Sequence, residues 1–140
     1  MIKVYIAGPM TGVGGNFNIP LFDHVANRLR STGKCEVFNP ADLARQMIGP
    51  LEMIMKLDKK TLKAKRKELI KHELVWICER ADYVLTLPGW QRSAGAKAEV
   101  ATAEAVDVPV RQVPNVVLYD SSLTDFDFEM HIENQKKIEA

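Results

Sequence analysis

The sequence predicts an α/β domain: a mostly parallel sheet between two helix layers, the three-layer, doubly wound arrangement of flavodoxin- and Rossmann-like proteins. Short β-rich runs alternate with helical stretches along the chain, which implies parallel pairing and right-handed crossovers. The chain has 140 residues, 46% of them hydrophobic and 26% charged, which suits one ordinary globular domain. We therefore expect a single domain over residues 1–140, with a core over about residues 2–119 and a polar C-terminal tail over residues 120–140.

The first half of the chain consists of β-rich runs and amphipathic stretches, each closed by a turn signal. Gly8-Pro9 and Asn39-Pro40 follow two expected strands. Pro20 fits the first turn of the helix between them, and Gly33 fits its end. The elements expected here are strands over residues 2–7 and 36–38, and helices over residues 20–32 and 41–48.

The second half begins with a long polar helical stretch and continues with a strand, a Pro/Gly loop and an Ala-rich helix. Residues 51–80 are expected to form one long helix, or two helices broken near Asp58. The other expected elements are strands over residues 81–87, 108–110 and 115–119, a helix over residues 95–106, and a helical tail over residues 125–139.

Charge and composition exclude several classes of function. The net charge of +1 argues against a nucleic-acid-binding or membrane-binding protein. The basic run from Lys56 to Lys71 is an exception, and its pattern favours the solvent face of a long helix over a phosphate or nucleic-acid patch. No apolar run has membrane-spanning length and the N-terminus predicts a strand, so we expect a cytoplasmic protein. Cys35, Cys78 and the three histidines lack motif spacing, so no metal site is expected and the thiols should be reduced.

Glu99 is the most informative residue. Helical geometry places it on one stripe with Gly95, Ala103 and Val106, the stripe expected to pack on the sheet. A carboxylate on such a face is costly unless it has a partner or a task. It also lies near a helix start that follows a strand, where open α/β sheets bind ligands. A functional role of Glu99 is therefore favoured over the alternative, a rotated helix in which Glu99 only stabilises the helix N-terminus.

Two glycine-containing loops should meet at this edge of the sheet, over residues 8–16 and 88–95. Glycines allow backbone N–H groups to approach an anion closely. The first loop does not match the dinucleotide fingerprint, since its glycine spacing differs, and no Gly-Lys-Ser/Thr closes a P-loop.

Taken together, three segments resemble the nucleoside 2-deoxyribosyltransferase-like superfamily. They are Tyr5-Ile6-Ala7-Gly8-Pro9, Ser93-Ala94-Gly95-Ala96-Lys97-Ala98-Glu99 and Val108-Pro109-Val110. The superfamily includes deoxyribosyltransferases and deoxynucleoside 5′-monophosphate N-glycosidases. The Ala-Gly-Pro-Met start and the Leu-Pro-Gly-Trp loop are most similar to an uncharacterised single-domain branch, and the resemblance covers about residues 2–110.

The resemblance implies a catalytic role for Glu99 at the anomeric carbon and for Tyr5 beside its carboxylate. It places Gly8 beneath the sugar. Ser93 matches a position that carries aspartate in members acting on free nucleosides and serine in members acting on 5′-monophosphates. Electrostatics agrees, because a carboxylate would repel a phosphate that a hydroxyl and helix-start N–H groups would bind.

The family's acid, an aspartate late in the preceding helix, is absent here. Leu74 occupies its place, and Glu73 is the nearest acid on the inner face of the expected helix. Glu73 is therefore our general-acid candidate with a shift of one residue, and the alternative is that it pairs with a neighbouring basic residue.

Other candidate substrate-binding residues also have structural explanations. Trp90 could stack on the base or pin its loop to the core. Phe17 could line the base pocket or staple the first helix. Asn39 could lie near the sugar or only form a turn. The remaining candidates from the motifs are Pro9, Met10, Gly89 and Gly95.

The resemblance implies hydrolysis of the N-glycosidic bond of (deoxy)nucleoside 5′-monophosphates, by a mechanism parallel to retaining glycoside hydrolysis and without metal or cofactor. The alternatives are base transfer between nucleosides, phosphoribohydrolase activity and a non-catalytic nucleotide-binding module. The resemblance also implies a homo-oligomer, a dimer or larger. The helix over residues 51–80 is a candidate interface, with Met53, Ile54, Leu57 and Leu62 as apolar contacts.

Overall fold

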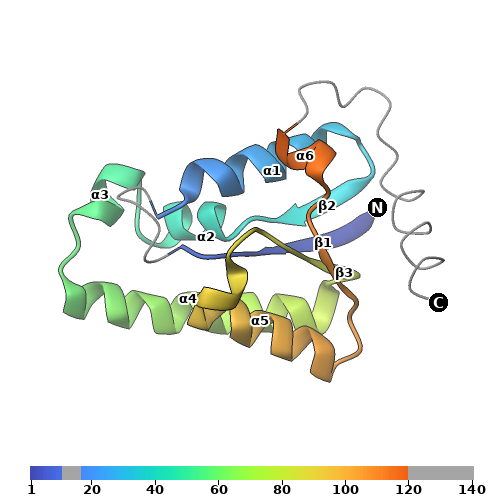
Figure 1. The fold of residues 1–140 in the computed structure, drawn as a ribbon. Coiled ribbons are helices and arrows are strands. Elements are labelled where there is room, and N and C mark those ends of the chain that lie inside the picture. Colours follow the sequence, from blue (N-terminus) through green and yellow to red (C-terminus); the bar gives the residue numbers. More distant parts are fainter. Residues whose placement is uncertain (11–16, 120–140) are drawn as a thin grey trace.

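The computed structural model describes residues 1–10 and 17–119 (Figure 1). The helix expected over residues 125–139, the polar tail and residues 11–16 of the first glycine loop lie outside the described residues.

The strands that the structure describes form one parallel sheet, as predicted. Its spatial order is β2-β1-β3-β4, so the chain first adds a strand on one side of β1 and then crosses to the other side. The switch in direction therefore falls between β1 and β3, the place where doubly wound folds bind ligands. The strands are β1 (Ile2–Ala7), β2 (Cys35–Phe38), β3 (Tyr83–Thr86) and β4 (Val110–Gln112).

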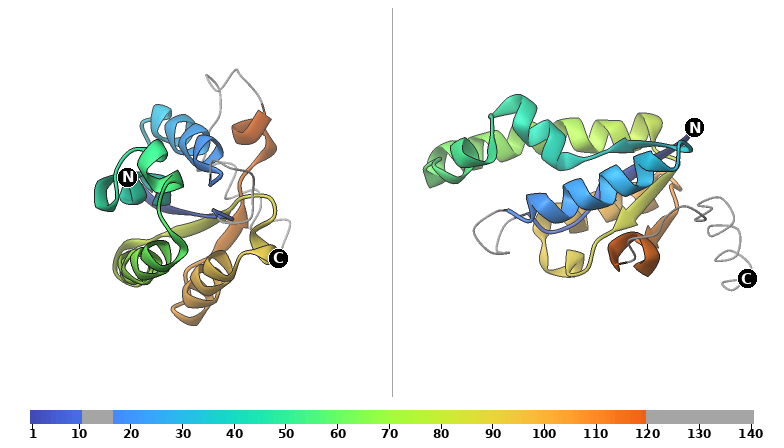
Figure 2. Two further views of the ribbon diagram at one scale, coloured as in Figure 1. Left: turned by 90° about the vertical axis from the view of Figure 1, so that its left-hand side faces the viewer. Right: turned by 90° about the horizontal axis from the view of Figure 1, so that it is seen from above.

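Helices cover both faces of the sheet and complete the three layers. Figure 2 shows α1 and α6 on one face and α4 and α5 on the other. Two short helices, α2 and α3, lie towards the carboxyl ends of the strands (Figure 1). The bounds are α1 (Ile19–Ser31), α2 (Pro40–Met47), α3 (Leu51–Met55), α4 (Lys59–Arg80), the 3₁₀ turn η1 (Trp90–Arg92), α5 (Ala94–Ala105) and α6 (Asn115–Tyr119). Among the described helices, none is long and apolar enough to cross a membrane.

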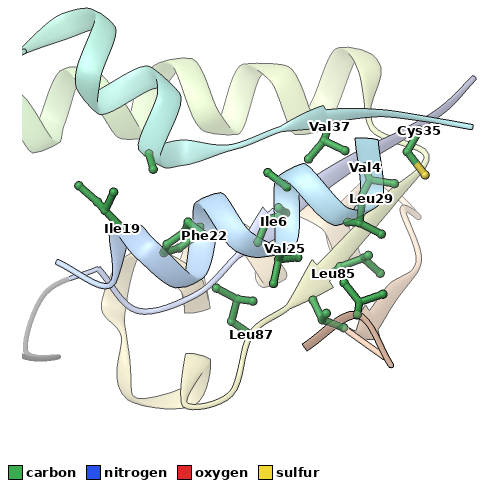
Figure 3. Packing of buried hydrophobic residues seen from close by; sticks show 14 of the residues in the cluster. Val4, Ile6, Ile19, Phe22, Val25, Leu29, Cys35, Val37, Leu85 and Leu87 are labelled. Carbon is green, nitrogen blue, oxygen red and sulfur yellow. The ribbon is translucent and has the colours of Figure 1, made fainter. Parts of the chain in front are cut away.

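The central strand β1 is buried on both faces because helices cover both. Val4 and Ile6 join the core under α1, where Figure 3 shows them beside the side chains of that helix. Tyr5 and Ala7 face the opposite core, under α4 and α5. Each large side chain buried in this way contributes roughly 1.5–3 kcal/mol. The alternation also decides which side chains of β1 can reach the inner faces of α4 and α5.

Two helices replace the single long stretch, and the break falls at the predicted place. Asp58 caps α4, since its carboxylate accepts hydrogen bonds from the backbone N–H and the hydroxyl of Thr61. The preceding helix α3 buries Ile54 in the core under α1. The prediction of Ile54 as an interface contact is therefore wrong, whereas Met53 is exposed.

The prediction of a strand over residues 115–119 is wrong, because these residues form α6. Pro114 starts the turn, and its carbonyl accepts a hydrogen bond from the N–H of Val117. Arg28 of α1 donates to the carbonyl of Val116 and holds α6 against α1. Short apolar runs fit a strand or a buried helix equally well, so periodicity alone could not decide.

The strand expected at residues 108–110 begins later, at Val110. The chain first closes α5: Asp107 adopts a left-handed conformation with φ of 59°, and the N–H of Val108 donates to Ala103. Val106 at this end is 43% exposed, so the predicted inner stripe of α5 stops at Ala103.

Candidate functional site

A cavity of about 460 Å³ opens at the carboxyl ends of the strands, between the helices on the two faces of the sheet. Its volume suits a small organic ligand. Most of the lining is apolar, and the polar and charged exceptions come from α4, from Ser93 before α5 and from Glu99 within α5. The lining residues are Gly8, Met10, Phe17, Phe22, Pro40, Ala44, Ile48, Ile54, Leu62, Lys63, Arg66, Lys67, Leu69, Ile70, Glu73, Ser93, Ala94, Gly95, Ala96, Ala98 and Glu99.

Glu99 lies on the inner face of α5, as predicted, and is only 5% exposed. The helix begins after Ser93, whose hydroxyl accepts a hydrogen bond from the N–H of Ala96. With the start fixed, Val100 and Ala103 pack inward and the carboxyl group of Glu99 lines the cavity.

Glu73 reaches the same cavity from α4 and is 7% exposed. It lies one turn before Ile77, the other buried residue of this helix, so its predicted inner position is confirmed. No ion pair within the described part of the chain involves Glu73, and the alternative of a basic partner has no support there.

Burial dominates the electrostatics of the two glutamates. Loss of hydration raises the pKa of Glu73 from 4.5 to about 7, partly offset by its interaction with the Tyr5 hydroxyl. Burial, and then the negative charge of Glu73, raise the pKa of Glu99 well above its usual value. Two carboxyl groups in such surroundings resist double ionisation, so the pair holds a proton near neutral pH.

Tyr5 is fully buried in the sheet behind the two carboxyl groups. Burial first, and then the charges of Glu99 and Glu73, raise the pKa of Tyr5 well above 10, so its hydroxyl stays neutral and can donate a hydrogen bond. Its ring stacks on Phe38 with the centroids 5.1 Å apart, and Trp76 packs at 6.3 Å. The ring position is therefore held by aromatic packing.

Two atoms of this cluster need a hydrogen-bond partner. Within the residues that the structure describes, the hydroxyl oxygen of Tyr5 and Oε2 of Glu99 are buried without a hydrogen bond of good geometry. Leaving such groups unsatisfied costs about 1–3 kcal/mol each, and native proteins tolerate it chiefly at functional sites or where a ligand or water completes the pairing.

Gly8 and Gly95 line the same cavity for different reasons. A Cβ atom on Gly8 would lie 2.7 Å from Cδ1 of Leu87, so the close approach of two strand ends requires glycine there. A Cβ atom on Gly95 would have no neighbour nearer than 3.9 Å, the hydroxyl of Ser93. Packing therefore does not demand glycine at position 95, and its absent side chain leaves cavity space open.

Some predicted substrate-binding residues line the cavity and others do not. Met10, Phe17, Gly8, Ser93 and Gly95 contribute to its wall. The described lining does not include Pro9, Asn39, Gly89 or Trp90.

Asn39 and the loop before η1 have structural roles instead. The side chain of Asn39 caps α2 by accepting from the N–H of Ala41, and its amide donates to Asp23. Asp23 is held in turn by Arg45, so Asn39 belongs to a polar network that joins α1 to α2. Gly89, with φ of 83°, makes the left-handed turn into η1, and Trp90 is half-buried there.

The sequence analysis did not place the basic residues of α4 at the cavity. Lys63, Arg66 and Lys67 of α4 line it, although the pattern of the basic run favoured a solvent face over a phosphate patch. The heptad spacing between Arg66 and Glu73 was the available signal, since it places both residues on one stripe. Among the described residues, no group of three or more His, Cys, Asp or Glu side chains is arranged to hold a metal ion.

Comparison with known proteins assigns the chain to a family without an assigned activity. The chain belongs to the family described as Domain of unknown function (DUF4406), whose model matches residues 2–112. The match spans every residue of the cavity described above. No curated protein matches the chain.

Proposed function

We propose that the protein hydrolyses the N-glycosidic bond of (deoxy)nucleoside 5′-monophosphates and releases the free base and the sugar phosphate. The observation that carries the proposal is the pair of buried carboxyl groups, Glu73 and Glu99, in one ligand-sized cavity at the switch point of the sheet. Cleavage of a glycosidic bond needs two carboxyl groups in different protonation states, and this pair holds one proton near neutral pH.

In the proposed first step, the carboxylate of Glu99 attacks the anomeric carbon. The bond from that carbon to the base nitrogen breaks, its electron pair goes to the base, and the carboxylic acid of Glu73 gives the base its proton. In the second step, water attacks the anomeric carbon, Glu73 takes the proton of the water, and the carboxylate of Glu99 is released. The neutral hydroxyl of Tyr5 donates a hydrogen bond that stabilises the anion.

The proton must be on Glu73 when the base leaves. In the free protein, burial raises the pKa of both glutamates, so burial alone does not assign the shared proton to one of them. Positive charge that develops at the anomeric carbon stabilises the anion beside it, so substrate draws the negative charge to Glu99 and the proton to Glu73. Azide tests the assignment through the configuration of the product. In Glu99→Ala, azide should displace the base directly and give a glycosyl azide of inverted configuration, whereas in Glu73→Ala it should attack the covalent intermediate and give one of retained configuration. The opposite pairing of variant and configuration would reverse the two roles.

The resemblance to the nucleoside 2-deoxyribosyltransferase-like superfamily supports the same chemistry, because its motif positions include Tyr5, Ser93 and Glu99. We further propose a homo-oligomer from this resemblance, and a location in the cytoplasm from the sequence pattern. Met53 and Met55 of α3 are each 51% exposed and are candidate contacts between subunits. Light scattering of the purified protein would show a dimer or larger, and a monomer at micromolar concentration would contradict the proposal.

The test is release of free base, measured by chromatography, from a panel of nucleosides and their 5′-monophosphates. We expect release from monophosphates without any acceptor. Release that requires a second base would establish base transfer instead. Binding of a monophosphate without any release, with or without an acceptor, would establish a nucleotide-binding module and refute the proposed hydrolysis.

A further inference from the structure

The cavity is electrically asymmetric. Its acidic groups, Glu73 and Glu99, are buried, whereas three cationic residues from the first half of α4 line it and are solvent-exposed: Lys63, Arg66 and Lys67. A ligand that suits such a cavity carries a neutral or developing positive centre at one end and an anion at the other. The neutral or developing positive centre belongs beside Oε2 of Glu99, which has no hydrogen-bond partner among the described residues.

Arg66 has the position from which a cation can serve the same ligand as Glu73. The two residues are seven apart on α4, so their side chains lie on one stripe, about 10 Å apart along the helix axis. This separation is comparable with the span of a pentose 5-phosphate together with the guanidinium that contacts its phosphate. Lys63 and Lys67 flank Arg66 along the cavity wall.

These cations are not committed elsewhere in the described part of the chain. None of the ion pairs found there includes Lys63, Arg66 or Lys67. The start of α5, capped by Ser93, lines the same cavity, and its backbone N–H groups add to the favourable potential for an anion.

We propose that Arg66, flanked by Lys63 and Lys67, binds the phosphate of the substrate and makes the site select nucleoside 5′-monophosphates over nucleosides. This inference rests on the proposed function for its ligand. A guanidinium presents planar paired donors that match phosphate oxygens, and the two lysines add charge without fixed geometry. Phosphate recognition would therefore depend on α4 as well as on the loop motif around Ser93.

The test compares Arg66→Ala with Lys71→Ala, which removes the same charge from an exposed position of α4 outside the cavity wall. For base release from a monophosphate, Arg66→Ala should raise KM about tenfold or more with a smaller change in kcat, and Lys71→Ala should leave both near wild type. KM for the matching nucleoside should not change. Higher salt should reduce the difference in KM for the monophosphate between wild type and Arg66→Ala, because salt screens the attraction between the guanidinium and the phosphate.

Arg66→Lys is expected to recover part of the affinity for a monophosphate that Arg66→Ala loses. If the role of Arg66 were only structural, an effect confined to the monophosphate would not be expected. If Arg66→Ala does not fold, the double variant Lys63→Ala/Lys67→Ala measures the same subsite. Equal effects of Arg66→Ala and Lys71→Ala, or an equal rise in KM for the nucleoside, would overturn the inference.

Calorimetric binding of a nucleoside 5′-monophosphate separates this inference from the proposed function. If wild type releases no base but binds the nucleotide, and Arg66→Ala weakens that binding about tenfold, the phosphate subsite stands and the hydrolase proposal fails. If wild type releases base and KM is indifferent to Arg66, the hydrolase proposal stands and the subsite fails. A wild type that neither binds nor cleaves the nucleotide overturns both.

Discussion

Replacing Glu73 with Gln should make the protein more stable, and increasingly so as the pH rises. The substitution keeps the size of the side chain and removes the charge that burial opposes. Because the pKa of Glu73 is raised in the folded protein, its contribution to stability is fully present below the pKa of the unfolded chain and is lost as pH rises through about 7. A glutamine has no such loss.

The magnitude follows from the two pKa values of Glu73, about 7 in the folded protein against 4.5 for a hydrated glutamate side chain. At 1.36 kcal/mol per pH unit, complete ionisation costs roughly 3 kcal/mol, and most of this cost appears between pH 5 and pH 8. The free energy of unfolding of Glu73→Gln should therefore gain roughly 2–3 kcal/mol on wild type over that interval. The negative charge of Glu73 also raises the pKa of Glu99, so removing that charge lowers the pKa of Glu99 and adds to the gain.

Urea unfolding followed by tryptophan fluorescence at pH 5, 6, 7 and 8 measures this difference directly. Glu68→Gln is the matched control, because Glu68 is exposed on the same helix. We expect the control to run parallel to wild type. If the curve of Glu73→Gln also runs parallel to wild type between pH 5 and pH 8, the buried and destabilised carboxyl group is refuted.

Three further substitutions test the walls of the cavity. Gly95→Ala should stabilise α5 by up to about 1 kcal/mol in thermal unfolding, because an alanine fits there, yet it should lower activity by filling ligand space; unchanged kinetics would contradict the open-space argument. Gly8→Ala should cost about 1–3 kcal/mol in urea unfolding because its Cβ would overlap Leu87, and wild-type stability would refute that close approach. Ser93→Asp should keep the helix cap, since aspartate also caps, but raise KM for a monophosphate about tenfold by repulsion, whereas an unchanged KM would count against a nearby phosphate.

The sequence was sufficient to predict the layers of the fold and the inner faces of the site helices. Alternating β-rich and amphipathic runs predicted the parallel sheet, because a buried central strand and a one-sided helix have different periods. The same projection placed Glu73 and Glu99 inward, and both are buried. The break expected near Asp58 and the helix expected from residue 95 also lie within a residue or two of the starts of α4 and α5.

The sequence-based predictions that failed concern features that depend on tertiary contacts, which local sequence patterns do not contain. Residues 115–119 form a helix because Arg28 of α1 donates a hydrogen bond to the carbonyl of Val116 and Val117 packs in the core under α1. Asn39 and Trp90 follow strands at the predicted edge, yet the polar network with Asp23 and the turn at Gly89 direct them to structural roles. The lysines of α4 looked like an ordinary solvent face, and only the packing of α4 beside the cavity reveals the basic wall.

The most direct test of the central claim, that the buried carboxyl group of Glu99 acts at the anomeric carbon, is the rate of base release by Glu99→Gln. The substitution keeps the shape of the side chain and removes a buried ionisable group, so the variant should fold at least as well as wild type. We predict a loss of activity on the order of a thousandfold or more against a nucleoside 5′-monophosphate, with the circular dichroism spectrum unchanged. A folded Glu99→Gln protein that releases base at the wild-type rate would contradict the account.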